Sequence, residues 1–224
     1  MVIFQREKRL KTCLKSENII EFSYIKRSVN YMKIYALMEN ISHDECLACE
    51  HGLSLYIEAD GKKILFDTGA SEKFAENAEK MGVDLKAVDF AANSHGHYDH
   101  GGGLAKFIEL NDHAPIYISD KGFNQYYSGT DFNVSIPEGL EGNERFVLTN
   151  APIKLSENIT LLNCNDREAK YFADPYGLNK LVDGEFLPDD FLHEQYLIIE
   201  ENGKRIVISG CSHKGILNIM EWLK

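Results

Sequence analysis

The chain has 224 residues, 44% of them hydrophobic and 26% charged, which is typical of one globular domain with a sizeable core. It contains no run of about 18 apolar residues, so the sequence predicts no transmembrane helix. The net charge of -11 argues against a function in binding bulk nucleic acid or anionic membranes. A bound metal would still attract an anionic small-molecule substrate, and the sequence leaves the oligomeric state open.

The N-terminal segment differs from the rest in charge. Residues 1–31 hold seven Lys or Arg and three Glu, a net charge of +4, whereas the remainder is strongly acidic. They lack the apolar core and the small-residue cleavage site of a secretory signal. One interpretation is a basic tail that binds a partner; we favour an extension upstream of a natural start at Met32. We therefore expect residues 1–31 to be poorly packed and residues 32–224 to form one domain.

Short apolar or alternating stretches, separated by polar turns, predict a domain rich in β-strands. Asp60-Gly61 and Asn202-Gly203 are dipeptides typical of tight hairpin turns, so the strands on either side of each should pair. The predicted strands span residues 33–38, 53–59, 62–66, 88–92, 115–119, 145–148, 159–162, 195–200 and 205–209.

Helices are predicted at three places. Apolar residues recur at helical spacing over residues 71–80, with Ser71 as the expected N-cap and Gly82 as the expected end. Two further helices should begin after glycines, near Leu104 and Gly215.

Two long segments, residues 120–142 and 163–188, are polar, rich in aromatic residues and free of a clear period. Long irregular segments in a compact domain often cover a substrate site. Residues 120–142 are equally consistent with helices packed into the core, and the sequence does not separate the two interpretations.

The cysteines do not suggest a disulfide framework, because their number is odd and they are widely scattered. A reducing cytoplasm is therefore the expected location. Cys46-Leu47-Ala48-Cys49 can be redox-active or half of a zinc site, but no second pair exists, and we favour plain loop cysteines. The five are Cys13, Cys46, Cys49, Cys164 and Cys211.

The strongest chemical signal comes from one run, Asn93-Ser94-His95-Gly96-His97-Tyr98-Asp99-His100, which three glycines follow. A predicted strand precedes it and a predicted helix comes after it, so the run lies where α/β folds place their chemistry. Imidazole and carboxylate groups are ligands of zinc and similar divalent metals. The other interpretation is a polar surface loop that happens to be rich in histidine. The spacing, the strand and the glycines favour a metal site.

The spacing also predicts how the ligands divide. His95 and His97 are two residues apart on a tight loop and can hold one metal, whereas Asp99 and His100 can hold a second. Two metals about 3.5–4 Å apart can share a water and lower its pKa towards roughly 7. The expected nucleophile is then a metal-bound hydroxide at neutral pH.

Three further stretches accompany this run: Glu50-His51-Gly52-Leu53-Ser54, Leu65-Phe66-Asp67-Thr68-Gly69 and the stretch from Ile208 to Ile216, which contains Gly-Cys-Ser-His. Together they resemble the metallo-β-lactamase superfamily, whose signature is His-x-His-x-Asp-His followed by glycines. Within it, the chain resembles the branch named for 7,8-dihydropterin-6-methyl-4-(β-D-ribofuranosyl)-aminobenzene-5′-phosphate synthase. The resemblance runs from about Met32 to the last residue.

The resemblance implies an α/β fold, the αβ/βα sandwich of two mixed sheets with outer helices and metals at one edge. It implies a divalent metal cofactor, two zinc ions in the first instance, with iron or manganese as alternatives. It also implies that Asp67 supports the metal loop through hydrogen bonds and does not bind metal, and that His51 lines the site.

A second group of candidate ligands follows the last predicted strand. His213 is predicted as a further metal ligand. Cys211 stands where many superfamily members have an aspartate that bridges both metals, and a thiolate can bind metal although it is the softer ligand. His193 and Glu194, before the preceding strand, are weaker candidates, and either can instead be a surface residue.

The resemblance implies a metal-dependent hydrolase, or an enzyme of hydrolase-like chemistry, in which Asp99 accepts a proton. The branch suggests a phosphoribosyl or pterin-related substrate. Family members continue with one more histidine ligand near a His-Cys-Thr-Gly run, which does not occur here. The alternative is therefore a non-catalytic or inactive metal-binding fragment of the same fold, incomplete at its C-terminus.

Overall fold

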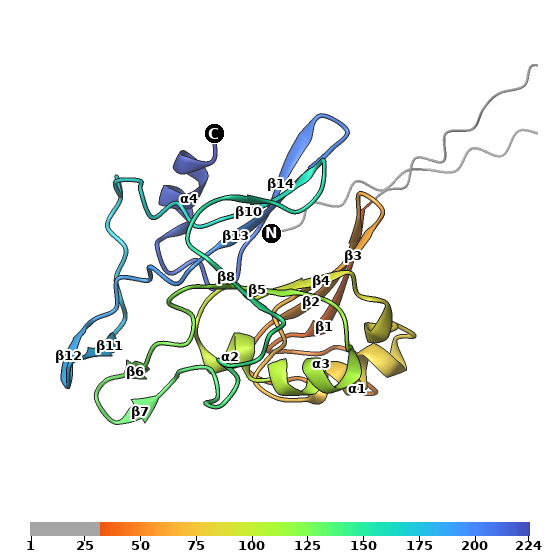
Figure 1. Cartoon of the computed structure of the whole chain (residues 1–224), viewed down its shortest axis with the longest axis horizontal. Helices are drawn as coiled ribbons and strands as arrows, with labels where there is room; N and C mark the ends of the chain where they lie inside the picture. Colours follow the sequence, from red (N-terminus) through yellow and green to blue (C-terminus); the bar gives the residue numbers. More distant parts are fainter. Residues whose placement is uncertain (1–31) are drawn as a thin grey trace, which may run out of the picture.

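The computed structural model describes residues 32–224, and the predicted N-terminal extension, residues 1–31, lies outside this part (Figure 1). Two sheets face each other, helices cover their outer sides, and a third, smaller sheet lies to one side. The expected α/β sandwich is therefore confirmed. Among the described helices, none is both long and apolar enough to cross a membrane.

The larger sheet carries the strand that leads into the histidine run. Its strand order is β1-β2-β3-β4-β5-β8. β1, β2 and β3 are antiparallel neighbours, whereas β4, β5 and β8 run parallel to β3. The carboxyl ends of β3 and β4 therefore meet at one edge, which brings Asp67 beside the histidine run. The strands are β1 (Lys33–Met38), β2 (Ser54–Ala59), β3 (Lys62–Phe66), β4 (Phe90–Ala92), β5 (Ile116–Ser119) and β8 (Phe146–Thr149).

The second sheet is antiparallel and has the strand order β14-β13-β10-β9. It faces the first sheet across a core in which Ile64, Phe66, Ile159 and Leu197 are fully buried. Burying each such side chain contributes about 1.5–3 kcal/mol, so this core fixes how the two sheets lie on each other. The strands are β9 (Ile153–Lys154), β10 (Ile159–Leu162), β13 (Tyr196–Glu201) and β14 (Lys204–Ile208).

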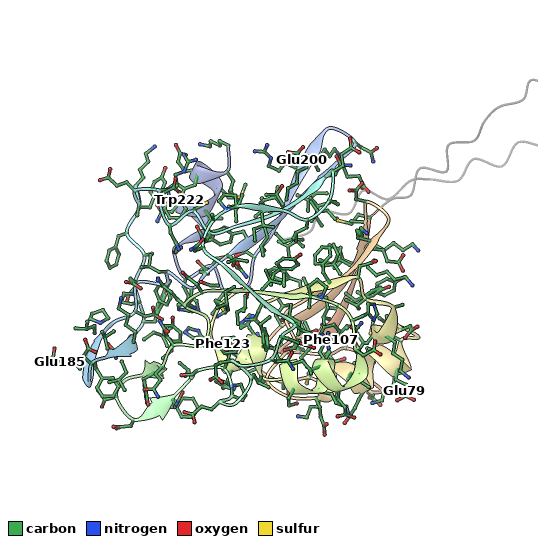
Figure 2. All side chains as sticks on the ribbon, in the orientation of Figure 1. Glu79, Phe107, Phe123, Glu185, Glu200 and Trp222 are labelled. Carbon is green, nitrogen blue, oxygen red and sulfur yellow. The ribbon has the colours of Figure 1, made fainter. Side chains whose placement is uncertain are left out.

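Helices complete the layers. α1, α2, α3 and the short 3-10 helix η1 lie beside the first sheet (Figure 1). The fully buried Phe74 of α1 shares one core with the strands of this sheet and with Phe107 of α3, which Figure 2 labels. α4 packs on the outer side of the second sheet, where Ile219 is fully buried against Tyr196 and Ile198. The helices are α1 (Lys73–Lys80), η1 (Leu85–Ala87), α2 (Tyr98–Gly101), α3 (Leu104–Leu110) and α4 (Ile216–Trp222).

The two aromatic segments form a third sheet that the sequence did not predict, with the order β12-β11-β6-β7. The interpretation of residues 120–142 as helices is wrong, because this segment contains two short strands and turns. Asp183 and Gly184, both with positive φ, form the turn between β11 and β12, a hairpin signal that the sequence did carry. The strands are β6 (Tyr126–Ser128), β7 (Phe132–Asn133), β11 (Leu178–Val182) and β12 (Glu185–Pro188).

Helix α1 begins later than predicted, and Ser71 is not its N-cap. Glu72 occupies that position without a side-chain hydrogen bond. The hydroxyl of Ser71 instead donates to the carboxylate of Glu50, at 2.8 Å, while its oxygen accepts a bond from the backbone N–H of Lys73. A contact between residues far apart in sequence thus outweighs the local capping preference.

Candidate metal centre

The histidine run folds into a buried turn between β4 and α2, which begins at Tyr98. His95, His97 and His100 lie in the protein interior, each residue no more than 4% exposed. Gly96 permits this packing, because a Cβ there would lie 2.6 Å from the carbonyl oxygen of Gly122. We call residues 93–100 the first ligand loop.

Asp67, directly after β3, accepts three hydrogen bonds from the first ligand loop. They come from the Ser94 backbone N–H at 2.6 Å, the Ser94 hydroxyl at 2.7 Å and the Nδ1 of His100 at 2.7 Å. Because the Ser94 hydroxyl gives its proton to Asp67, its oxygen accepts from the Nδ1 of His95, at 2.8 Å. With the Nδ1 proton held in this way, the neutral form of each ring has its lone pair on Nε2, the form in which imidazole binds a metal.

Three imidazoles from two parts of the chain meet at the centre. The Nε2 atoms of His95, His97 and His213 are buried and have no hydrogen-bond partner among the described residues. Ligand atoms of these three residues lie within 4.8 Å of one another. Buried polar atoms without partners are costly, and one shared cation would satisfy all three. The donor set therefore fits a divalent metal such as zinc.

His100 and Cys211 form a second group with His95, again with ligand atoms within 4.8 Å. The Nε2 of His100 lies 3.1 Å from the Sγ of Cys211 and 3.3 Å from the Oδ2 of Asp99. Asp99 lies beside His100 as predicted, but it belongs to none of the three ligand groups found among the described residues. Cys211 is exposed, so this second position opens towards solvent. We call residues 209–214 the second ligand loop.

A third group, His97, Asp189 and His193, was largely missed by the sequence analysis. The Oδ2 of Asp189 lies 3.1 Å from the Nε2 of His193 and 3.6 Å from that of His97. The Nδ1 of His193 accepts the backbone N–H of Gly96 at 2.8 Å, so the proton of this ring is on Nε2 and is donated to Asp189. His193 is therefore fully hydrogen-bonded without a metal. The available signal was an aspartate and a histidine four residues apart, just before a predicted strand.

Burial and neighbouring charges shift the pKa values of the imidazoles in different directions. Burial, together with the adjacent imidazoles, lowers the pKa of His95 well below its ordinary value and that of His213 to about 3. Burial also disfavours the charged form of His100, but Asp67 outweighs it and raises the pKa of His100 well above its ordinary value. His95 and His213 are thus neutral at pH 7, whereas His100 must release a proton before it can bind a cation.

His51 lies at the rim rather than in the buried part of the site. Its Nε2 is 3.4 Å from the Oδ2 of Asp99, and its side chain is 72% exposed. The neighbouring Gly52 has a φ of +140°, and a Cβ there would lie 2.2 Å from the carbonyl oxygen of Asp99. Only glycine allows this close approach, which holds His51 beside Asp99.

A cavity of about 500 Å³ lies beside the second ligand loop. His213 and Asp189 form part of its wall, so the cavity reaches the candidate metal centre. Tyr171, Phe172 and Trp222 also line it. Part of the irregular segment 163–188 thus lies next to the centre, and no residue of segment 120–142, for which a substrate-covering role was predicted, lines this cavity.

Comparisons with known proteins agree with this architecture. Residues 47–214 match the family model described as the metallo-beta-lactamase superfamily. The 7,8-dihydropterin-6-methyl-4-(beta-D-ribofuranosyl)-aminobenzene-5'-phosphate synthase of Methanocaldococcus jannaschii is 32% identical over 211 residues, which cover 86% of this chain and 72% of that protein. An uncharacterized protein of the same organism is 30% identical over 196 residues, or 85% of this chain and 73% of that protein.

One solved structure is similar over most of the chain. The crystal structure of Tm1679, described as a metal-dependent hydrolase of the beta-lactamase superfamily, aligns with a TM-score of 0.69 and 30% identity, covering 86% of this chain and 71% of that one. The family model and this structure lead to the same assignment. The chain belongs to the metallo-β-lactamase superfamily.

Proposed function

We propose that this chain is a metal-dependent enzyme of hydrolase type, with a centre for two divalent ions, most simply zinc. The observation that carries this proposal is the trio of buried, unpartnered Nε2 atoms on His95, His97 and His213. Imidazole is a preferred zinc ligand, and the thiolate and carboxylate beside His100 suit a second ion. The proposed ligands are His95, His97, Asp99, His100, His213 and Cys211.

When bound, the metal supplies a Lewis acid that polarises a carbonyl or phosphoryl oxygen of the substrate. Ser94 and Asp67 bind the Nδ1 atoms of His95 and His100, so that the opposite nitrogen of each ring is the one left for a metal, and His100 binds once its Nε2 proton has left. Burial opposes the charge on Asp99, but its bond to His100 and the neighbouring imidazoles lower its pKa, so it stays ionised at neutral pH. Its Oδ2, beside the exposed His51, is the proposed proton acceptor.

The residues that line the cavity beside His213 support the proposal of a small, anionic substrate. Cationic side chains outnumber carboxylates along its wall, and a cationic wall favours an anion even in an acidic protein. Aromatic rings in the same wall offer flat apolar contact to a ring-containing group. The charged residues are Arg167, Lys170, Lys214, Asp189 and Asp190.

Elemental analysis of protein purified without added metal tests the centre, and a panel of chromogenic esters, thioesters and phosphodiesters tests the activity. We expect bound zinc, iron or manganese, and turnover that a chelator abolishes and added metal restores. A protein that takes up no divalent metal, or whose turnover ignores the chelator, would contradict the proposal. Metal binding with no turnover on any substrate would favour the non-catalytic alternative.

A pterin-related synthase is the second candidate, because a relative that is 32% identical carries that activity in its name. The product named there carries both a 7,8-dihydropterin-6-methyl group and a ribofuranosyl phosphate on one aminobenzene. Metal-loaded protein should then join a dihydropterin that bears a leaving group on its 6-methyl carbon to the amine of a ribofuranosyl-aminobenzene phosphate, with release of the leaving group and a proton, and the product is detected by mass spectrometry. If no product forms and the panel shows hydrolysis, the synthase proposal is rejected and the hydrolase proposal is kept.

A further inference from the structure

Glu194 is a buried carboxylate that binds the backbone of the second ligand loop. Its side chain is inaccessible to solvent, at 0% exposure. One oxygen accepts the backbone N–H of His213 at 2.7 Å, and the other accepts the N–H of Lys214 at 3.1 Å and the hydroxyl of Tyr196 at 2.8 Å. Bonds to a buried carboxylate are stronger than neutral ones, because no water competes for the charge. The position of His213 therefore depends on Glu194.

The next residue, Gln195, binds the other side of the centre. Its backbone N–H donates to the carbonyl oxygen of Ser94 at 2.8 Å, and its side-chain amide donates to that of Asn93 at 2.7 Å. Its side-chain oxygen accepts the hydroxyl of Thr149, at the end of β8. Gln195 precedes β13 of the second sheet, yet its partners are in the first sheet and the first ligand loop.

His193 adds a third connection, because its Nδ1 accepts the backbone N–H of Gly96, which lies between His95 and His97 in the first ligand loop. The tripeptide His193-Glu194-Gln195 is at most 1% exposed at each position. Glu194 thus reaches the second ligand loop, whereas His193 and Gln195 on either side of it reach the first.

We propose that His193-Glu194-Gln195 is a joint that sets the spacing of the two ligand loops, with Glu194 as the positioning residue for His213. Its side chains act through hydrogen bonds: Glu194 and Gln195 bind backbone groups of the two loops, and both ring nitrogens of His193 have partners in Gly96 and Asp189. This inference rests on the proposed metal centre and adds a group of residues that controls it. Partners of this kind orient ligands and affect metal affinity without touching the metal.

The substitution Glu194→Gln tests the joint with almost no change in size. A carboxylate accepts hydrogen bonds at both oxygens, but an amide has one oxygen and an NH2 group, which is a donor. One of the N–H groups of His213 and Lys214 would then face another donor, and the second ligand loop would shift. We expect the affinity for Zn²⁺ to fall by about 10- to 100-fold. The absorption spectrum of bound Co²⁺ should also change, because it reports the arrangement of the ligands.

Glu200→Gln is the matched control, since it makes the same substitution in β13, the strand that begins two residues after Glu194. Glu200 is exposed, pairs with Arg205 and lies at the far end of β13 (Figure 2). The joint is supported if Glu194→Gln alone weakens Zn²⁺ binding and alters the Co²⁺ spectrum. Equal affinities and spectra for wild type, Glu194→Gln and Glu200→Gln would overturn it.

A measurement on the unaltered chain covers the case in which Glu194→Gln does not fold. Amide hydrogen exchange followed by NMR, in metal-free protein, should show His213 and Lys214 protected to the same degree as the centre of β13. Exchange as fast as in an exposed loop would overturn the joint. Failure of the wild type to bind Zn²⁺ or Co²⁺ would instead overturn the proposed function, and the exchange result would still decide whether the joint holds the loop.

Discussion

The two ligand loops hold their side chains by different means. In the first ligand loop, the rings of His95 and His100 are themselves hydrogen-bonded through Nδ1, to Ser94 and Asp67. In the second, Glu194 holds the backbone of His213, and the ring is supported by stacking on Phe191, with centroids 4.5 Å apart and planes 7° from parallel.

This comparison separates two tasks that a metal site requires of a protein. The first ligand loop fixes the tautomer and the direction of its rings before any metal arrives, whereas the second fixes only where its residues lie. Preorganised rings lose little freedom on binding, so they contribute more to affinity than groups that must still be ordered. We therefore expect substitutions in or behind the first ligand loop to have the larger effects.

The largest effect is expected for His95→Ala, because His95 belongs to both the His97–His213 group and the His100–Cys211 group. Its loss removes a ligand from both positions, so the protein should no longer retain stoichiometric zinc after dialysis, as measured by elemental analysis. His113→Ala is the control, since His113 is an exposed loop histidine whose ring contacts Asp112. Retention of the full metal content by His95→Ala would contradict a centre shared through this residue.

Asp67→Asn should have the next largest effect, although Asp67 is not a proposed ligand. The amide of Asn cannot accept all three bonds that Ser94 and His100 donate, and His100 then loses the partner that fixes its tautomer. Zinc affinity should fall by about 10- to 100-fold, as measured by competition with a chromogenic chelator. Asp112→Asn, at the surface, is the control. An unchanged affinity would show that the first ligand loop is not preset by Asp67.

The sequence predicted the first ligand loop well and the surroundings of the second poorly, for a physical reason. The first loop is contiguous, and its signals, a buried strand, closely spaced ligands and glycines, are all local. Asp189 and His193 matter only because the loop after the unpredicted β11–β12 hairpin brings them beside His97 and Gly96, contacts that no local pattern records. The hairpin carried a local signal, Asp183-Gly184, that was overlooked.

The fold shows the same division between local and long-range information. Strands with strong period or turn signals lie within one or two residues of their predicted ends, as β10 and the β13–β14 hairpin illustrate. The prediction of Ser71 as the N-cap of α1 was wrong because Glu50, far away in sequence, competes for the Ser71 hydroxyl. Site residues such as Glu194 depend on the packing of two sheets, which a single sequence does not specify.

Cys211→Ser tests how much the second ligand loop contributes to metal binding. Cys211 is exposed and belongs to only one ligand group, so we expect zinc affinity to fall less than in Asp67→Asn, by about tenfold. A hydroxyl is a much poorer metal ligand than a thiolate, so sulfur-to-cobalt charge-transfer absorption should disappear. Cys46→Ser, at another exposed cysteine, should leave both unchanged. Charge-transfer absorption that survives in Cys211→Ser would place the sulfur ligand elsewhere.

The smallest expected effect is the pH dependence of the stability of the metal-free protein. His100 has a raised pKa, because Asp67 outweighs the burial that opposes its charge, whereas burial and neighbouring imidazoles lower the pKa of His213 to about 3. The unfolded chain has a histidine pKa of about 6.5 for both. His100 therefore contributes stability that is fully present below about pH 6.5 and is lost as the pH rises through its folded pKa. His213 has the opposite sign: it lowers stability as the pH falls below about 6.5, because only the unfolded chain takes up its proton.

NMR titration of the imidazoles after chelator treatment, from pH 5 to 8, checks both directions. His213 should show no titration in this range, and His100 should remain protonated at pH 7. Asp67→Asn should lower the pKa of His100, because it removes the carboxylate charge, whereas His213 should still show no titration from pH 5 to 8, because its burial is unchanged. If His213 instead titrates near 6.5, its ring is open to water in the metal-free chain, and the second ligand loop is then not held in place before metal binds.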